Sequence, residues 1–174
     1  LSKYKAVLAP MLYLLDDDSE QSLIDYSTAG GSLIVSYFTG ISNQVDTVKL
    51  GGYGGKLVRD HLGVFVDEFA PIRSGEKVLL SNGMTGTEWS QFASAEGAEV
   101  EASFVGGIAD GSLAIAKSAR GFNWYLGTRL TSESNLKFFT EISDVLALTR
   151  RGGNEVEVIR RGGVEFRIDH RVNQ

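Results

Sequence analysis

The sequence predicts an α/β fold with a mostly parallel sheet, followed by a short antiparallel β segment, and three observations predict it. Residues 4–9 and 32–37 are short apolar runs typical of buried strands. Between them, an acidic start at Asp16-Asp17-Asp18 and a stop at Gly30-Gly31 are helix signals. The near-continuous apolarity of residues 32–37 is typical of a parallel sheet that is covered on both faces.

The middle of the chain adds further strands. Residues 38–55 are a long loop rich in Gly, Asn and Asp, and residues 56–62 form a short helix that Gly63 stops. Strand-type runs then follow at residues 64–69, 77–80, 88–92, 99–104, 113–117 and 123–126, the last two as a hairpin around Arg120-Gly121.

The end of the chain changes character near residue 150. Residues 132–148 carry an apolar stripe at helical spacing, with Ser132 placed to cap the helix. Residues 156–160 and 164–169 predict a lone hairpin around Gly162-Gly163. This change predicts one domain over residues 1–150 and a separate β segment over residues 151–174.

Composition excludes several kinds of function. The chain has 174 residues and a net charge of −5, so we expect no nucleic-acid partner, which would need a basic surface. The absence of Cys excludes disulfides, thiolate metal sites and a cysteine nucleophile, and two His give little material for a metal site or a triad. No signal-peptide pattern and no apolar run of about 20 residues is present, so we expect a cytoplasmic protein without a membrane partner.

Five features could carry chemistry, and each has a simpler explanation. Asp16-Asp17-Asp18 could bind a cation but fits a helix N-terminus better. Residues 51–55, Gly-Gly-Tyr-Gly-Gly, could hold a phosphate, but a tight turn is favoured. His61 is expected at a surface or an interface, His170 at a strand end, and Asn154-Glu155 on an isolated hairpin where nothing positions a second carboxylate. We therefore predict no catalytic, cofactor-binding or metal-binding residue.

The aromatic residues are the more informative candidates. Tyr37, Phe38, Tyr53, Trp89 and Trp124 could pack in the core, stack on a sugar or lie between subunits, and the sequence alone leaves these alternatives open.

Segments along most of the chain resemble the middle domain of family 42 β-galactosidases. They are, in chain order, residues 4–15, 26–35, 38–41, 50–57, 62–64, 68–71, 88–89, 97–100 and 124–128. Residues 156–161 with Asp169-His170 resemble the opening of that family's C-terminal β domain.

The resemblance implies a flavodoxin-like, class I glutamine-amidotransferase-like three-layer αβα fold without amidotransferase chemistry. It also implies that the domain joins subunits, usually into a homotrimer, and that the galactoside-cleaving carboxylates lie in an N-terminal barrel absent here. Asn154-Glu155 does not correspond to the catalytic pair of that barrel. The family's domain begins one strand and one helix earlier, so we expect a fragment of a longer chain with an uncovered sheet edge that favours self-association.

The candidate interface residues are Tyr37, Phe38, Tyr53 and Arg59, with Trp89 and Arg129 as weaker candidates, because long ordered loops usually have a function. Two alternatives remain. One is a carbohydrate-binding module that uses Trp89, Trp124 and Tyr53 as stacking platforms, and the other is a stand-alone enzyme of the amidotransferase-like fold.

Overall fold

The computed structural model describes residues 1–45, 47–48, 52–148 and 156–169. The chain divides into two compact units, Leu1–Asn135 and Leu136–Gln174, which are described separately. The first unit contains, in chain order, β1 (Ala6–Ala9), α1 (Asp17–Thr28), β2 (Ser32–Ser36), the π-helix η1 (Lys56–His61), β3 (Val64–Pro71), β4 (Lys77–Leu80), β5 (Thr85–Thr87), β6 (Trp89–Ala95), β7 (Glu99–Val105), β8 (Leu113–Lys117), β9 (Trp124–Leu126) and β10 (Arg129–Leu130).

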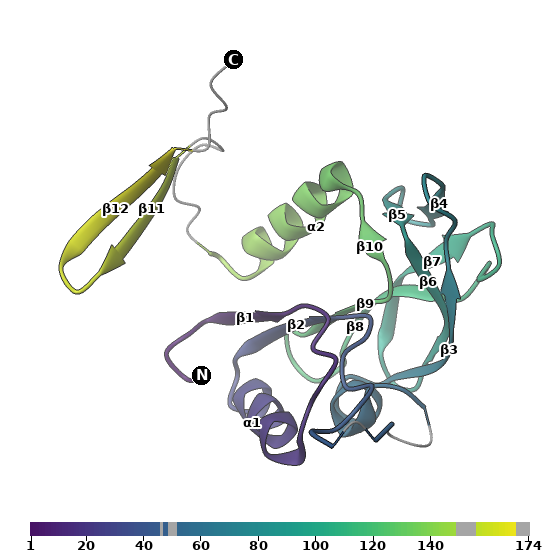
Figure 1. The fold of residues 1–174 in the computed structure, drawn as a ribbon, viewed down its shortest axis with the longest axis horizontal. Helices are drawn as coiled ribbons and strands as arrows, with labels where there is room; N and C mark the ends of the chain where they lie inside the picture. The colour runs from purple at the N-terminus through teal and green to yellow at the C-terminus, as the bar shows by residue number, and fades with distance from the viewer. Residues whose placement is uncertain (46, 49–51, 149–155, 170–174) are drawn as a thin grey trace. The chain divides into compact units, whose positions relative to one another are not determined.

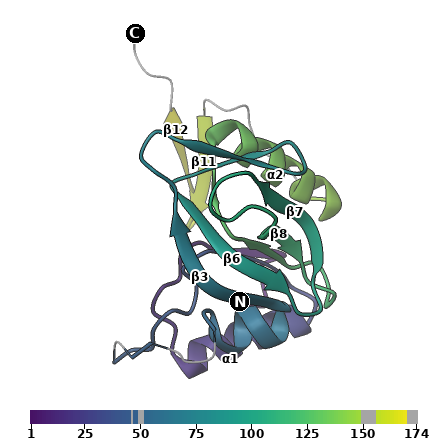
Figure 2. The same cartoon turned by 90° about the vertical axis from the view of Figure 1, so that its right-hand side faces the viewer.

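An eight-stranded sheet organises the first unit, in the order β1-β2-β9-β8-β7-β4-β5-β10 (Figure 1). A two-stranded ribbon of β3 and β6 packs against β8, so the strands curl around one another (Figure 2). The α/β class predicted from the sequence is confirmed.

The prediction of a mostly parallel sheet is wrong. Among the strands in the described residues, β1–β2 and β2–β9 are the parallel pairs of this sheet, whereas the pairs from β9 through β8, β7, β4 and β5 to β10 are antiparallel. The reason is connection length. A parallel pair needs a crossover of a dozen or more residues, which α1 supplies between β1 and β2, while short turns join most of the later strands.

The helices α1 and η1 lie side by side on one face of the sheet (Figures 1 and 2). α1 begins after Asp16, whose carboxylate accepts a hydrogen bond from the Ser19 N–H at 2.7 Å. The buried carboxylate of Glu20 in α1 accepts the Leu57 N–H at 2.9 Å. An acidic side chain of one helix therefore satisfies a backbone group at the start of the next.

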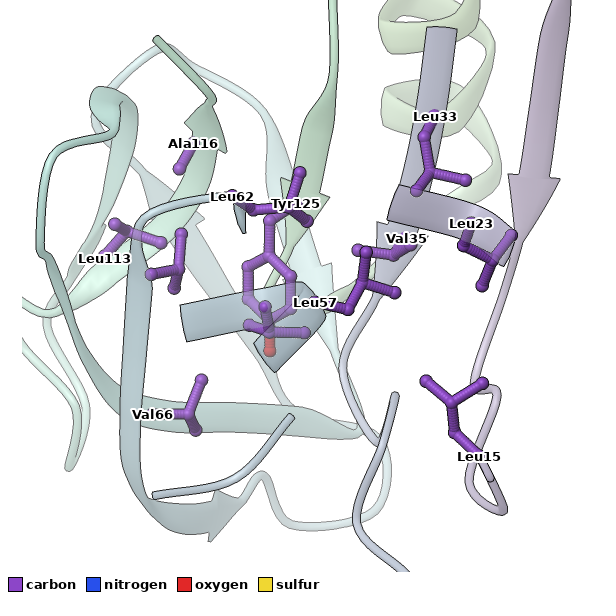
Figure 3. Packing of buried hydrophobic residues seen from close by; sticks show 12 residues of the cluster. Leu15, Leu23, Leu33, Val35, Leu57, Leu62, Val66, Leu113, Ala116 and Tyr125 are labelled. Carbon is purple, nitrogen blue, oxygen red and sulfur yellow. The ribbon is translucent and has the colours of Figure 1, made fainter. Parts of the chain in front are cut away.

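The hydrophobic core lies between these helices and the strands, and Figure 3 shows twelve of its residues. Leu23 comes from α1, Leu33 and Val35 from β2, Leu57 from η1 and Tyr125 from β9. The remaining members are Leu15, Val58, Leu62, Val64, Val66, Leu113 and Ala116.

A buried side chain also ties the parallel strands together. Asn123 is fully buried, and its Oδ1 accepts a hydrogen bond from the Leu33 N–H at 2.9 Å while its Nδ2 donates to the Arg120 carbonyl. Because Asn123 directly precedes β9 and Leu33 lies in β2, this amide fixes two strands that are far apart in the sequence.

The second unit holds most of α2 (Ser132–Val145) and the antiparallel hairpin of β11 (Val156–Arg161) and β12 (Val164–Asp169). The predicted helix and hairpin are thereby confirmed. The cap of α2 lies one residue earlier than predicted, because the Thr131 hydroxyl rather than Ser132 accepts the Ser134 N–H. Within the described ranges, no helix is both long enough and apolar enough to cross a membrane.

Candidate subunit interface

Four of the six predicted interface residues gather in one place. The rings of Phe38, Tyr53 and Trp89 pack around Phe69, and the Tyr37 ring packs against those of Phe38 and Trp89. These five residues are called the aromatic cluster below. Ring centroids lie 4.4 Å apart for Phe38 and Trp89, 5.2 Å for Phe38 and Phe69, and 4.4 Å for Tyr53 and Phe69. Such tilted and offset pairs are favourable aromatic geometries.

The cluster lies where the parallel strands end. Tyr37 and Phe38 directly follow β2, and the Tyr37 N–H donates to the carbonyl of Leu126, the last residue of β9, at 2.7 Å. Trp89 opens β6 and pairs with Pro71 at the end of β3. In open α/β sheets, ligands and partners usually bind at the carboxyl ends of the parallel strands. The carboxyl ends of β2 and β9 are therefore the natural place for a candidate site.

Two residues here have backbone conformations that side chains disfavour. Phe38 has φ of 63° and Glu88, next to Trp89, has φ of 62°, both in the left-handed region. Such conformations cost about 1–3 kcal/mol each and gather at functional sites, where the surroundings enforce them.

An exposed ion pair borders the cluster. Arg129 Nη1 lies 2.5 Å from Glu88 Oε2, and more than half of each side chain is exposed. The hydrogen bond to Glu88 raises the pKa of the Arg129 guanidinium. Burial raises the pKa of the Tyr37 hydroxyl, the positive charge of Arg129 opposes that shift, and Glu88 adds to it. The charges of Arg129 and Glu88 therefore both act on the Tyr37 hydroxyl.

The cluster also holds an unused donor. The buried Trp89 Nε1 has no hydrogen-bond partner among the described residues, and the same is true of Thr39 Oγ1 beside Phe38. A buried donor without a partner is costly, by about 1–3 kcal/mol.

Arg59 is the predicted interface residue that the structure does not bring to the cluster. Its Nε bonds Glu96 Oε2 at 3.1 Å, and its guanidinium lies 5.1 Å from the ring centroid of Phe65. Arg59 and Arg129 are thus exposed arginines paired with glutamates at two different places.

Sequence reasoning missed Phe69 and Glu88. Phe69 has the pattern of an ordinary strand residue, and only its place as the last residue of the predicted strand 64–69 could have drawn attention to it. The role of Glu88 depends on its left-handed backbone and on Arg129, which is 41 residues away, and no local sequence signal carries either fact.

The other candidates from the sequence have structural roles or lie outside the described residues. Asp16 caps α1, and this hydrogen bond lowers the pKa of its carboxyl. Gly52, Gly54 and Gly55 have positive φ values, as a tight turn requires. Residues 51, 154, 155 and 170 are not described. The described part of the chain contains no group of three or more His, Cys, Asp or Glu that could hold a metal ion.

His61 corrects a further expectation. It was expected at a surface or an interface, but it is buried, and its Nε2 lies 2.8 Å from the Ser27 hydroxyl. The reason is that η1 packs against α1, which carries Ser27, and this pairing spans 34 residues.

The proposed sugar platforms are poorly placed for stacking. Trp124 is buried and donates to Glu101 Oε1 at 3.3 Å, while Tyr53 and Trp89 pack against Phe69. The structure thus places a partly covered aromatic cluster beside an ion pair, at the carboxyl ends of β2 and β9. Such a combination of aromatic and charged side chains is suited to contact with another protein.

Comparisons with known proteins agree on one family. The β-galactosidase trimerisation domain model matches residues 1–149. β-Galactosidase BgaB of Geobacillus sp. (strain Y412MC61) is 41% identical over 133 residues, which cover 74% of this chain and 20% of BgaB. A β-galactosidase of Arthrobacter sp. is 34% identical over 184 residues, covering 98% of this chain and 26% of the relative.

Solved structures show the same fold. The cold-adapted β-galactosidase from Rahnella sp. R3 superposes with a TM-score of 0.83 at 23% identity, over 92% of this chain and 26% of that one. The β-galactosidase from Halorubrum lacusprofundi gives 0.83 at 22% identity, over 98% and 26%. The chain therefore spans about a fifth to a quarter of the length of these proteins.

The fold and the site define a mixed α/β domain with a mostly half-buried aromatic cluster beside an exposed ion pair. The chain belongs to the β-galactosidase trimerisation domain family of family 42 β-galactosidases, as its sequence resemblance indicates.

Proposed function

We propose that this chain joins copies of itself into a homotrimer through the surface formed by the aromatic cluster and the Glu88–Arg129 pair. The observation that carries the proposal is that distant aromatic residues form one cluster around Phe69, beside the exposed ion pair. Aromatic residues and Arg are the residue types enriched at subunit contacts.

The whole protein is proposed to be a β-galactosidase that hydrolyses terminal β-D-galactosides. Its relatives are β-galactosidases, and this chain matches about a fifth to a quarter of their length. The carboxylates that cleave the substrate are assigned to a part of the protein outside these residues. The cytoplasmic location expected from the sequence stays a prediction.

We also propose that β1, β2 and β9 belong to a flavodoxin-like three-layer arrangement that a preceding strand and helix would extend. β1 stands at the edge of the sheet with no partner on its outer side among the described residues, and Leu8 within it is about half exposed. A further strand that paired with the outer side of β1 would satisfy its free backbone groups and cover its exposed apolar side chains.

The hairpin of β11 and β12 supports the division into a domain over residues 1–150 and a β segment over residues 151–174. Val164, Phe166 and Ile168 alternate along β12 and are exposed, with Glu165 and Arg167 between them. An isolated hairpin is marginally stable, so its apolar side chains suit the opening of a larger β domain.

Matched charge reversals test the interface. We expect the unmodified 174-residue chain to be trimeric by light scattering at micromolar concentration. Arg129→Glu places two acids side by side at the rim of the cluster and should shift the mass toward that of the monomer. Arg59→Glu reverses an equally paired arginine outside the cluster and should leave the mass unchanged. A monodisperse monomer of the unmodified chain would contradict the proposal.

Activity provides a second test. The purified chain should not hydrolyse an aryl β-galactoside, because the proposal places the catalytic carboxylates outside it. Turnover that rises with the concentration of the pure chain would overturn this assignment.

A further inference from the structure

The π-helix η1 connects the aromatic cluster to the buried side chain of His61. Tyr53 belongs to the cluster, and two glycines with positive φ, Gly54 and Gly55, separate it from η1. The Val58 N–H donates to the Gly54 carbonyl at 3.2 Å, so the start of η1 is bonded to this glycine pair. π-Helical turns are rare and often occur at functional sites. A movement of η1 would therefore also move the residues that lead to Tyr53.

Two side-chain contacts hold η1 on α1, one at each end of the π-helix. At the start, Glu20 accepts the Leu57 N–H at 2.9 Å. At the end, the Nε2 of His61 lies 2.8 Å from the Ser27 hydroxyl. The His61 carbonyl also accepts a hydrogen bond at 3.2 Å from the hydroxyl of Ser118, which directly follows β8. His61 is therefore the residue that attaches the end of η1 to its neighbours.

The surroundings of the His61 ring favour the neutral imidazole. The residue is 6% exposed, and burial disfavours a charged ring. Arg120, in the turn before β9, adds a positive charge, so burial and this charge both lower the pKa of His61. The closed contact between η1 and α1 therefore holds a ring that resists protonation.

The carboxylates of the elements packed against His61 do not offset this effect. Glu20 of α1 is buried, but it faces the Leu57 N–H at the other end of the contact. From Asp25 onward in α1, and throughout η1 and β3, the charged residues are exposed to water, which screens them. These residues are Asp25, Lys56, Arg59, Asp60, Asp67 and Glu68. Among the described residues, Arg120 is the charge that acts on the ring.

We propose that the contact between His61 and Ser27 is acid-sensitive: when the His61 ring takes up a proton, η1 separates from α1 and opens locally with residues 53–55, while the rest of the first unit stays folded. The proton comes from water and turns the ring into a cation. The open form exposes this cation to water, whereas the closed form buries it near Arg120. The device lies within one copy of the chain, so it does not depend on the proposed trimer.

The ordinary pKa of histidine limits the size of the effect. With a pKa of about 6.5 in the open form, about a tenth of the open chains carry the proton at pH 7.5 and about nine-tenths carry it at pH 5.5. If the closed form stays neutral, the ratio of open to closed chains rises about tenfold between these two pH values. Proton uptake by the closed form would reduce that factor.

Amide hydrogen exchange of the full 174-residue chain at pH 7.5 and 5.5 measures the opening. After correction for the intrinsic effect of pH, protection of the Leu57 and Val58 amides should fall by up to about tenfold at pH 5.5. In His61→Gln it should change by less than about twofold. His170→Gln is the matched control, because it removes the other histidine of the chain and should behave like the unmodified protein.

Low concentrations of urea separate local opening from unfolding of the whole unit. Exchange at Leu57 should respond weakly to urea, whereas exchange at Leu33, fully buried in β2, should follow global unfolding. Equal urea dependence at the two amides would overturn the inference. Protection of Leu57 that is the same at both pH values, or that falls equally in His61→Gln, would overturn it as well.

An NMR titration keeps the inference testable if His61→Gln does not fold. His170→Gln leaves His61 as the single imidazole of the chain. Its titration midpoint in the folded chain should lie below about 6.5, the value for an exposed ring. A midpoint at or above that value would show that the closed contact accepts the proton, and the inference would fall.

Discussion

The parallel and antiparallel parts of the sheet are held together in different ways. In the parallel part, side chains bridge long separations: Asn123 reaches Leu33 in β2, and Glu20 reaches Leu57. In the antiparallel part, three of the five strand pairs (β8–β9, β7–β8 and β4–β5) join strands that follow each other in the chain through short connections. The difference teaches that crossover connections need distant polar contacts to fix them, whereas hairpins are fixed by their turns.

The largest expected effect is on the core beneath the parallel strands. Leu33 is fully buried in β2, so Leu33→Ala should reduce the free energy of unfolding by about 2–5 kcal/mol through lost burial and a cavity. Leu79→Ala changes an exposed leucine in the antiparallel part and should cost no more than about 0.5 kcal/mol. Denaturant unfolding followed by circular dichroism measures both.

A third leucine tests whether the two parts unfold together. Leu80 is buried in β4, next to the exposed Leu79, and Leu80→Ala should cost about as much as Leu33→Ala. If the parts form one cooperative unit, both variants will show a single transition. Two separate transitions in either variant would show that the parts unfold independently.

The second prediction concerns the link between α1 and η1. Glu20→Ala leaves the buried Leu57 N–H without its acceptor and should cost about 1.5–3 kcal/mol, because hydrogen bonds to charged groups are the stronger ones. Glu20→Gln keeps a side-chain oxygen that can accept the Leu57 N–H, so the free energy of unfolding should fall much less in this variant than in Glu20→Ala. Equal losses in the two variants would argue that the charge, and not this hydrogen bond, is what matters.

The third prediction concerns the amide that joins β2 to the start of β9. Asn123→Ala leaves the Leu33 N–H and the Arg120 carbonyl unsatisfied and should cost about 1–3 kcal/mol. Asn82 is the matched control, because its side chain accepts the Met84 N–H at 3.1 Å in an exposed turn of the antiparallel part. Water can replace that bond, so Asn82→Ala should cost less, and a loss as large as that of Asn123→Ala would contradict the comparison.

The same contrast explains what the sequence could predict. The first strand, helix and strand follow from local apolar patterns and the cap at Asp16, and the structure has all three. The choice of partner strand depends on distant contacts: β2 pairs with β9, about 90 residues later, and no local pattern encodes this. The long-loop argument selected Tyr37, Phe38 and Tyr53, which do cluster. It also ranked Arg59, which pairs with Glu96 away from the cluster, above Arg129, which pairs with Glu88 beside it.

His61 yields the smallest expected effect and tests its unexpected burial. Burial, with a contribution from the positive charge of Arg120, lowers the pKa of His61 below its usual value of about 6.5. The folded chain then binds a proton at this site less readily than the unfolded chain. The stabilising contribution is therefore complete above pH about 6.5 and is lost as the pH falls, by at most about 1.4 kcal/mol per pH unit.

The stability of the unmodified chain should accordingly fall between pH 6.5 and 5 more steeply than that of His61→Gln, which has no group to protonate there. Unfolding in urea across this range gives the two slopes. The lowered carboxyl pKa values of Asp16 and Glu165 act at lower pH and are common to both chains, so they cancel in the comparison. Parallel curves for the two chains would mean that the imidazole is protonated as easily in the folded chain as in the unfolded one, and that its contact with Ser27 tolerates the charge.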